Sequence, residues 1–423
     1  MTNTDNQPHK NWAGNFYYNA SQVHEPQTVE EVQDVVRQAS QVKALGSRHS
    51  FNSIADTAAD HISMAGLNRI VSLDPDQQTV TIEGGVRYGE LGTYLDAEGF
   101  ALHNMASLPH ISVVGACATA THGSGVKNGN LATGVTGLQF VAADGELVTL
   151  AEGDEGFLGA VVGLGALGIV TRMTLKLEPR YDVQQTVYLN LPMSELEGQI
   201  DDILAGAYSL SLFTTWEGDS FAQAWLKQRV TDAGALDSAP QFYKAVLATE
   251  AMGPIADVPV ENVTQQLGVV GSWHERLPHF RMEFTPSHGE ELQTEYFVPR
   301  QDAQEAIAAM RTIGEQIAPH LLISEVRTIA ADDLWLSPCY HQDCLAFHFT
   351  WKQDWPAVKT VLPLIESVLA PYQPRPHWGK LFTMPAEAVQ ARYERLPDFQ
   401  QLIQKYDPQH KFGNSFLESY IYA

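Results

Sequence analysis

The spacing of apolar residues along the first half of the chain predicts a series of short helices and strands. Between residues 28 and 40, valines recur at helical spacing, which indicates an amphipathic helix. Residues 42–46 follow as a short strand that ends in a glycine, and residues 79–83 alternate between apolar and polar positions as a strand does. Residues 87–99 return to helical spacing, so this half of the chain mixes helices with sheet.

A β-hairpin is predicted at residues 138–150, because Asp144 and Gly145 separate two alternating segments there. A further strand, residues 171–178, ends at Pro179, and we place the first domain boundary at this point. The chain has 423 residues, more than one hydrophobic core usually serves, which also favours two domains.

The second half of the chain carries longer alternating segments with a helical segment between them. They predict three strands and one helix, namely strands 279–285, 321–329 and 345–351 and helix 302–317. Strands separated by helices, with polar groups aligned on one strand face, indicate an α+β domain whose sheet floors a pocket.

Composition limits the class of protein. Hydrophobic residues make up 44% and charged residues 18%, which is typical of an ordered globular protein. No run of 18 apolar residues occurs, and the polar N-terminus lacks the basic and apolar regions of a signal peptide. Only three cysteines are present, too few for a disulfide framework. We therefore expect a cytoplasmic protein with no membrane partner, and we take a monomer as its working state.

The formal net charge of −24 restricts the partners of the protein. It results from 26 basic and 50 acidic side chains. A negative field of this size repels nucleic acid and anionic membrane surfaces. A neutral substrate can approach without opposing this field, and a local basic pocket can override it.

Three glycines at positions 163, 165 and 168 match the G-x-G-x-x-G dinucleotide fingerprint. That fingerprint requires a strand before it and a helix after it, whereas here a strand follows and no clear strand precedes. A glycine-rich turn close to a ligand or to neighbouring backbone is therefore the stronger interpretation.

Two other segments combine small and polar residues, residues 45–52 and 115–125. Successive backbone N–H groups in such loops form concave anion sites suited to a pyrophosphate. Either loop alone is equally consistent with a plain turn. Two of them in one domain favour an extended ligand held by backbone, which makes Leu45, Gly46, Ser47 and Arg48 candidate contacts.

Several longer motifs resemble a known family. Gly-Ser-Arg-His-Ser at 46–50, Ser-Leu-Pro-His at 107–110 and Ala-Thr-Ala-Thr-His-Gly-Ser at 118–124 are similar to the FAD domain of the vanillyl-alcohol oxidase type. Arg-Pro-His-Trp-Gly-Lys at 375–380 and the segment 407–414 resemble the sugar-lactone and alditol oxidase branch. Residues 11–15, 104–110 and 325–327 are most similar to the alditol (xylitol) oxidases.

The resemblance implies a two-domain FAD-binding fold and a covalent flavin on His49. A neutral imidazole nitrogen is a competent nucleophile near pH 7. The implied parts are an FAD-binding domain (1–178), a substrate domain (179–374) and a C-terminal segment returning to the flavin (375–423). The positions that match the family's FAD contacts are Ser50, Ser107, Ser112, Gly115, Thr119, Ala120, Thr121, His122 and Ile169. Arg48 departs from the small residue often found there.

A candidate substrate site lies on the strands of the second half. Glu325 and Arg327 are two apart, as are His348 and Thr350, so each pair faces one side of its strand. An ion pair such as Glu325 and Arg327 usually lies solvated on the protein surface. The same spacing also recurs at His279, Arg281 and Glu283. The resemblance implies a polyol site formed by Ser107, Glu325, Arg327, Thr350 and Lys380, with His348 beside them.

The chemistry implied is oxidation of an alditol by FAD, with O₂ as the electron acceptor and hydrogen peroxide as a product. Arg327 and Lys380 would stabilise the developing alkoxide, Glu325 would accept substrate hydroxyls, and His348 would orient Lys380 or relay the proton. An aldonolactone oxidase or dehydrogenase of the same fold is the alternative, and an acceptor other than O₂ remains open.

One segment suggests a metal site instead. Cys339, His341, Cys344 and His348 place four potential zinc ligands within ten residues, but at a spacing unlike that of common zinc fingers. We expect no metal; a flavin-free, zinc-stapled sugar-binding protein is the competing class.

Overall fold

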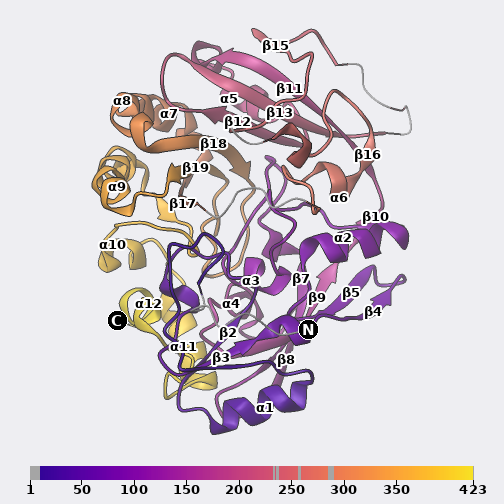
Figure 1. The fold of residues 1–423 in the computed structure, drawn as a ribbon, viewed down its shortest axis with the longest axis vertical. Helices are drawn as coiled ribbons and strands as arrows, with labels where there is room; N and C mark the ends of the chain where they lie inside the picture. The colour runs from indigo at the N-terminus through magenta and orange to yellow at the C-terminus, as the bar shows by residue number, and fades with distance from the viewer. Residues whose placement is uncertain (1–9, 232–233, 235–237, 256–258, 284–289, 423) are drawn as a thin grey trace.

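The computed structural model describes residues 10–231, 234, 238–255, 259–283 and 290–422. Two layers of structure are visible in Figure 1, with the first part of the chain below and most of the second part above. The last residues of the chain run back along the side of the lower part. The predicted α+β class is confirmed.

The lower part contains two sheets of three or more strands among the described residues. The first has three parallel strands in the order β1-β3-β2, namely β1 (Gln22–His24), β3 (Asp60–Ser63) and β2 (Val42–Leu45). The second has five antiparallel strands in the order β4-β5-β9-β7-β8, namely β4 (Ile70–Asp74), β5 (Thr79–Glu83), β9 (Ile169–Lys176), β7 (Val135–Val141) and β8 (Leu147–Ala151). The predicted strands 42–46, 79–83 and 171–178 are found here.

The helices of the lower part are short and amphipathic. They are α1 (Val29–Gln38), α2 (Tyr88–Ala97), α3 (Val113–Ala118) and α4 (Phe157–Val161). Thr28 caps α1 by accepting a hydrogen bond from the backbone N–H of Glu31, and Val32 and Val36 are buried beneath the helix. The helix predicted from the valine spacing is therefore confirmed, as are helix 87–99 and the hairpin, whose turn places Gly145 at φ +84°.

A ten-stranded antiparallel sheet dominates the upper part of the described structure. The path β14-β15-β11-β13-β12-β18-β19-β17-β20 runs across it, with β16 beside β11. Its strands are β11 (Asp182–Pro192), β12 (Ser209–Thr214), β13 (Ser220–Arg229), β14 (Gln241–Phe242), β15 (Ala245–Leu247), β16 (Gly271–Ser272), β17 (Glu291–Pro299), β18 (Leu321–Ile329), β19 (Cys344–Lys352) and β20 (Arg375–Pro376). The predicted strands 321–329 and 345–351 are β18 and β19.

Helices cover one face of this sheet and occupy its ends. They are α5 (Ile200–Leu204), α6 (Trp273–Arg276), α7 (Ala303–Arg311), α8 (Gly314–Ile317) and α9 (Trp355–Leu369). Phe347 and Phe349, which flank His348 on β19, join the hydrophobic core that α7 and α9 share. The predicted helix 302–317 is interrupted after Arg311, and the new helix starts where Gly314 lies against the backbone of Trp216.

The predicted strand at 279–285 is wrong for the residues that the structure describes. Residues 279–283 form only an isolated bridge, between Phe280 and Val263, followed by a turn. Residues 284 and 285 lie outside the described part. The consecutive residues His279 and Phe280 both line a cavity, so their side chains do not alternate between two faces as in a strand.

The C-terminal residues connect the two layers. β20 pairs with β17 in the large sheet, and the chain then continues through α10 (Ala386–Gln390), α11 (Leu396–Tyr406) and α12 (Ser415–Leu417). α11 packs against α4 of the lower part. The boundary proposed after residue 178 falls at β10 (Glu178–Pro179), which pairs with β6 (Phe100–Ala101) just before the large sheet begins. No helix in the described residues is both long and apolar enough for a membrane span.

Candidate active site

A single cavity is bounded by both layers of the structure. The lower part contributes the loop after β2, the start of α3 and the turn at residues 163–168. The large sheet contributes one face of β17, β18 and β19, and the loop after β20 closes the wall. All predicted site residues line this cavity except two, Ala120 and Ile169. The two motif groups, far apart in sequence, therefore meet at one place.

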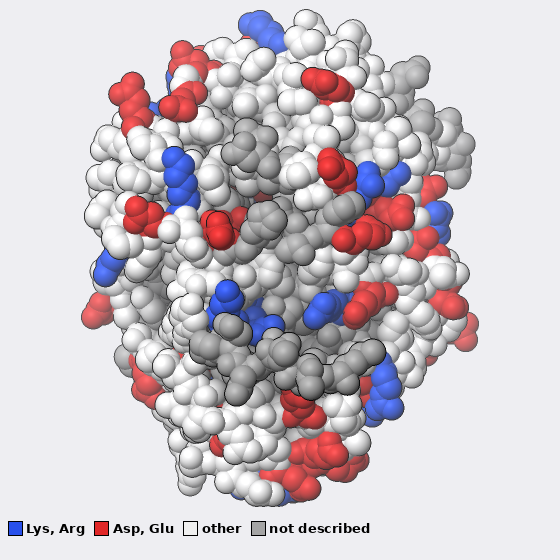
Figure 2. Space-filling view, viewed as in Figure 1, with Lys and Arg blue, Asp and Glu red and all other residues white. Residues whose placement is uncertain are grey.

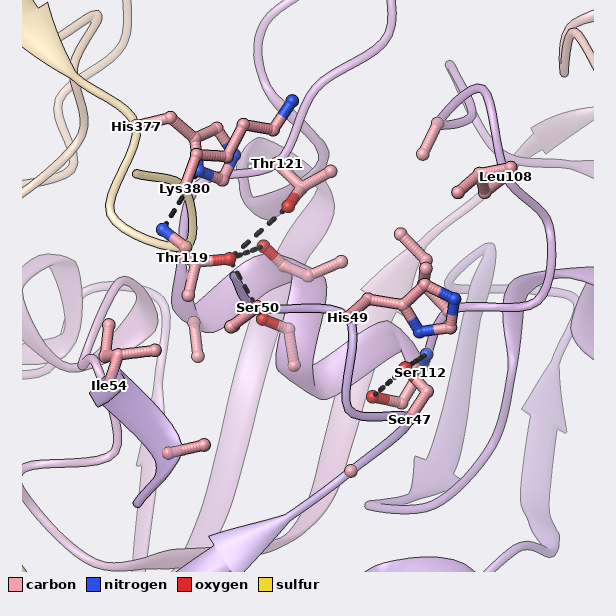
Figure 3. A pocket seen from close by; sticks show the side chains of 18 of the residues that line it. Ser47, His49, Ser50, Ile54, Leu108, Ser112, Thr119, Thr121, His377 and Lys380 are labelled. Atoms are coloured by element: carbon pink, nitrogen blue, oxygen red, sulfur yellow. Dashed lines mark hydrogen bonds between the residues drawn. The ribbon is translucent and has the colours of Figure 1, made fainter. Parts of the chain in front are cut away.

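The loop after β2 is packed tightly against the start of α3. A Cβ at Gly46 would lie 2.6 Å from Ser112 Oγ, so only glycine fits without displacing that side chain. The Ser47 hydroxyl accepts a hydrogen bond of 2.9 Å from the backbone N–H of Ser112, and Figure 3 shows the two residues side by side. Arg48 adopts a left-handed conformation with φ +61°, which turns the chain toward His49.

The side chain of His49 is fixed in place with one ring nitrogen free to react. Its ring stacks on Trp12, with centroids 5.2 Å apart and planes inclined by 18°. Its Nδ1 atom is buried and has no hydrogen-bond partner within the described structure. Burial lowers the pKa of His49 to about 4, so the imidazole is neutral near pH 7 and keeps a free lone pair. These are the properties required of a nucleophile for covalent attachment.

The segment after α3 lines the same wall with hydroxyl groups. Thr119 and Thr121 lie with their hydroxyl oxygens 3.3 Å apart, as Figure 3 shows. Ala120 between them has φ +54° and is buried in the protein core, away from the cavity. Ile169 packs with Val32 and other residues in a separate hydrophobic cluster. Both positions were predicted to contact FAD; their side chains pack in hydrophobic clusters, and neither lines the cavity.

The glycine motif at 163–168 forms a turn, and the structure excludes the Rossmann interpretation. Helix α4 precedes the turn and strand β9 follows it, the reverse of the order that the fingerprint requires. Leu164 and Gly165 have φ of +52° and +65°. Buried Lys43 donates a hydrogen bond of 3.0 Å to the Gly165 carbonyl, and the turn lines the cavity.

A row of ionisable side chains crosses three adjacent strands of the large sheet. In the strand register Glu325 of β18 lies opposite His348 of β19, which in turn lies opposite Glu295 of β17. Alternation places Arg327 and Thr350 on the same face. Three adjacent strands of the sheet thus present five polar side chains to the cavity.

Glu325 and Arg327 form a buried pair, so the solvated surface interpretation is wrong. Their side chains are 6% and 7% exposed, and Arg327 Nε lies 3.5 Å from Glu325 Oε1. Arg327 Nη1 also donates to Ser107 Oγ at 3.3 Å. Burial alone would raise the pKa of Glu325, but Arg327 and His279 outweigh it and hold the pKa far below its usual value. Glu325 is therefore a carboxylate that accepts hydrogen bonds.

Lys380 reaches the row from the loop after β20. Asn52 fixes this loop by donating hydrogen bonds of 2.8 Å to the carbonyls of Trp378 and Lys380. Lys380 Nζ lies 2.7 Å from His348 Nδ1. Because an ammonium group only donates, Nδ1 accepts, and His348 Nε2–H is left to donate to Thr350 Oγ1 at 3.1 Å. Burial lowers the pKa of His348 to about 4, which agrees with this neutral form.

Sequence reasoning missed three residues of this cluster. Glu295 contacts Lys380, Arg327 and His122, and the signal available was a carboxylate directly before the apolar residues 296–298. His279, cited above as a sign that the spacing is uninformative, places Nε2 2.7 Å from Glu325 Oε1. Buried Lys227 donates to His279 Nδ1 at 3.0 Å and thereby fixes the tautomer that donates to Glu325.

The four potential zinc ligands are not brought together. Cys339 and Cys344 are buried in a small hydrophobic cluster, whereas His348 faces the cavity. His341 is exposed and stacks on Tyr340. Within the described residues no group of three or more His, Cys, Asp or Glu side chains is arranged to hold a metal ion.

The cations in the cavity contrast with the outer surface. Figure 2 shows Asp and Glu side chains spread from the top to the bottom of the visible face, with fewer Lys and Arg side chains among them. Many of the acidic side chains behind the net charge of −24 therefore lie on the exterior, while Arg327 and Lys380 lie inside the cavity. The cavity provides the local positive charge that a developing oxyanion requires.

Comparison with known proteins gives two family matches and one close relative. Residues 20–151 match an FAD binding domain, and residues 284–420 match the D-arabinono-1,4-lactone oxidase family. The chain is 48% identical to alditol oxidase from Streptomyces sp. (strain IKD472 / FERM P-14339) over 414 residues, which cover 97% of this chain and 98% of that protein.

Solved structures share the fold at low sequence identity. Cholesterol oxidase from B. sterolicum superposes with a TM-score of 0.79 at 15% identity, covering 100% of this chain and 99% of that one. Glucooligosaccharide oxidase from Acremonium strictum, described with a 6-S-cysteinyl, 8α-N1-histidyl FAD, gives 0.73 at 16% identity and covers 98% and 94%. These similarities confirm the predicted FAD-binding fold.

Proposed function

The chain belongs to the FAD-dependent alditol oxidase family, and from this premise we propose that it oxidises alditols such as xylitol and sorbitol at a terminal carbinol, with O₂ as the electron acceptor. The products would be an aldose and hydrogen peroxide. The observation that carries the proposal is the buried cluster of Glu325, Arg327, His348 and Lys380 in the cavity that His49 also lines.

The lower part of the cavity fits a flavin. The free Nδ1 of His49 is available for a covalent bond to the cofactor. Gly46 and Gly115, where a Cβ would meet Ser112 Oγ, let the loop after β2 pack closely on the start of α3, and backbone N–H groups of such loops suit a pyrophosphate. Ser47, Ser50, Ser112, Thr119 and Thr121 would contribute polar groups along the same wall. When bound, FAD supplies the acceptor for the hydride that leaves the carbinol carbon, and O₂ reoxidises it.

The residues on the sheet face would bind and polarise the polyol. Ser107, Thr350 and the Glu325 carboxylate offer hydrogen bonds to successive hydroxyls, which suits a substrate with a hydroxyl on each carbon. Lys380 and Arg327 would stabilise the alkoxide that develops as the reacting hydroxyl loses its proton. A site with this many buried polar groups disfavours substrates without hydroxyls, because the groups would be left unpaired.

His348 is better suited to orienting Lys380 than to relaying a proton. Its Nδ1 lone pair accepts from Lys380, and its pKa near 4 makes it a weak proton acceptor at neutral pH. Its Nε2–H bond to Thr350 links the ammonium group to a substrate-binding hydroxyl. Replacing His348 with Gln should therefore leave the pH dependence of turnover unchanged while lowering its maximum.

An aldonolactone oxidase is the second candidate, favoured by the match of residues 284–420 to the D-arabinono-1,4-lactone oxidase family. The deciding experiment measures hydrogen peroxide from the purified protein with xylitol, sorbitol, glycerol, gulonolactone and galactonolactone in parallel. Our proposal requires the alditols to be the better substrates. Peroxide formation from the lactones alone would establish the second candidate.

The cysteines bear on the cellular compartment in which the protein works. Cys117, Cys339 and Cys344 are buried free thiols, which supports a reducing compartment such as the cytoplasm. We also propose that the protein is a monomer. Cell fractionation and size-exclusion chromatography with light scattering test these two points.

A further inference from the structure

Glu295 occupies the centre of the ionic cluster, yet no motif in the sequence includes it. It lies on β17, with its side chain only 1% exposed, in the wall of the cavity. A buried carboxylate is unfavourable unless charges and hydrogen bonds compensate for its lost hydration. The neighbours of Glu295 therefore indicate what it is for.

Each carboxylate oxygen of Glu295 faces a different cation. Oε1 lies 3.2 Å from Arg327 Nη2 and 3.1 Å from His122 Nε2. Oε2 lies 2.8 Å from Lys380 Nζ and 3.6 Å from His348 Nδ1. Arg327 comes from β18 and Lys380 from the loop after β20. Glu295 therefore joins two cations that belong to different elements.

His122 supports Glu295 from the first part of the chain. Its Nδ1 lies 2.8 Å from the Gly123 carbonyl while its Nε2 faces Glu295 Oε1. Burial lowers the pKa of His122, so its ring is neutral near pH 7 and carries a single N–H. The tautomer with this proton on Nε2 donates to the Glu295 carboxylate. His122, expected to contact FAD, therefore also fixes the orientation of the Glu295 carboxyl group.

We propose that Glu295 is a positioning residue, which holds Arg327 and Lys380 together by an ion pair with one cation on each of its two oxygens. This inference rests on the function proposed above. Glutamine cannot replace it, because an amide has one acceptor oxygen and its NH₂ group would point at the other cation. Aspartate keeps the charge and both oxygens but has a shorter side chain.

Glu295 also keeps Lys380 charged within the buried site. Burial lowers the pKa of Lys380, and Glu295 is the principal group that opposes this effect. The ionisable groups around Lys380 come from β17, β18, β19 and the β20 loop, and they are Glu295, Glu325, Arg327, His348 and His377. Without the charge at position 295, Arg327 repels the ammonium group and only the more distant Glu325 attracts it.

The first test is the pH dependence of xylitol oxidation in Glu295→Gln and Glu295→Asp. For Glu295→Gln we expect kcat to fall at least about tenfold with a smaller change in KM, since the cations act on the transition state. The alkaline limb of the profile should move down by about one pH unit or more as Lys380 loses its proton more easily. In Glu295→Asp the alkaline limb should lie closer to its wild-type position, with a shift no more than half of that in Glu295→Gln.

The second test does not need turnover. Lys380 is labelled with acetic anhydride at a series of pH values in the flavin-loaded protein, and mass spectrometry of its peptide gives the midpoint of its reactivity. The midpoint should be lower in Glu295→Gln than in the wild type. Glu366→Gln is the matched control, because Glu366 on α9 accepts hydrogen bonds from Tyr296 and Thr383 on the adjoining strand and loop. Its midpoint should equal that of the wild type.

The two tests separate the two proposals. If the wild type oxidises neither alditols nor lactones, the proposed function fails and the labelling midpoint still decides the role of Glu295. An unchanged midpoint and an unchanged alkaline limb in Glu295→Gln would overturn that role. If Glu295→Gln lacks flavin or folded structure, the same midpoint is measured in Glu295→Ala, which also lacks the carboxylate: a midpoint lowered by about one pH unit supports charge retention, and a midpoint equal to the wild type contradicts it.

Discussion

Replacing Lys380 with Met removes the ammonium group from the cavity while keeping much of the side-chain volume. The ammonium nitrogen lies 2.7 Å from His348 Nδ1 and 2.8 Å from Glu295 Oε2, so the substitution leaves Glu295 with Arg327 as its main cation. Losing one preorganised group that stabilises an oxyanion typically costs about 100-fold to 1000-fold in turnover, or about 3–4 kcal/mol. Breaking a buried ion pair costs about 3–5 kcal/mol of stability.

The assay couples peroxide release from xylitol to a peroxidase, with rates normalised to the flavin absorbance of each preparation. We expect kcat/KM of Lys380→Met to fall by about 100-fold to 1000-fold, and added methylamine to restore part of the rate. Lys352→Met is the control, because Lys352 ends β19 on the surface and donates to the Pro319 carbonyl. A Lys380→Met enzyme that turns over within about threefold of the wild type, with normal flavin content, would refute the assignment of alkoxide stabilisation to Lys380.

Three further predictions follow from the cavity walls. His49→Ala should release its FAD on acid precipitation, whereas the wild type should keep its flavin; absorbance of the supernatant distinguishes the two. Burial holds the pKa of His279 at about 4, so the unfolded chain takes up its proton first as the pH falls. The contribution of His279 to the free energy of unfolding should be constant above about pH 6.5 and decrease toward pH 4, so His279→Gln should lack roughly 3 kcal/mol of the wild-type decrease over this range in denaturant titrations. Gly168→Ala should unfold more easily than Gly99→Ala, since its Cβ would lie 2.4 Å from the Val141 carbonyl while Gly99 has open space; equal midpoints would contradict this reasoning.

Much of the fold could be predicted from local patterns. The valine spacing of α1, the Asp-Gly turn of the hairpin and the alternation in β18 and β19 each depend on neighbouring residues, so they are visible in the sequence. The segment at 279–283 alternates in sequence but forms only one isolated bridge, and its adjacent residues His279 and Phe280 both line the cavity. Period alone does not distinguish a sheet face from a loop that lines a pocket.

Site residues could be predicted from the sequence only where they belong to a recognisable motif. Glu325, Arg327 and Lys380 belong to recognisable strings, but Glu295 and His279 do not. Their roles depend on strand order, since β17, β18 and β19 become neighbours only through long-range pairing. Lys227 is more remote still, because it reaches Glu325 through His279 from β13. Such contacts are properties of the tertiary fold.

The central claim is that a polyol delivers its hydride in the cavity between His49 and Lys380. The most direct measurement mixes the purified protein with xylitol in the absence of oxygen and follows the flavin absorbance. We expect the yellow colour to bleach in one turnover with formation of one equivalent of aldose, and to return when air is admitted. An absorbance that stays unchanged with every alditol, in protein whose flavin remains attached after denaturation, would contradict the account.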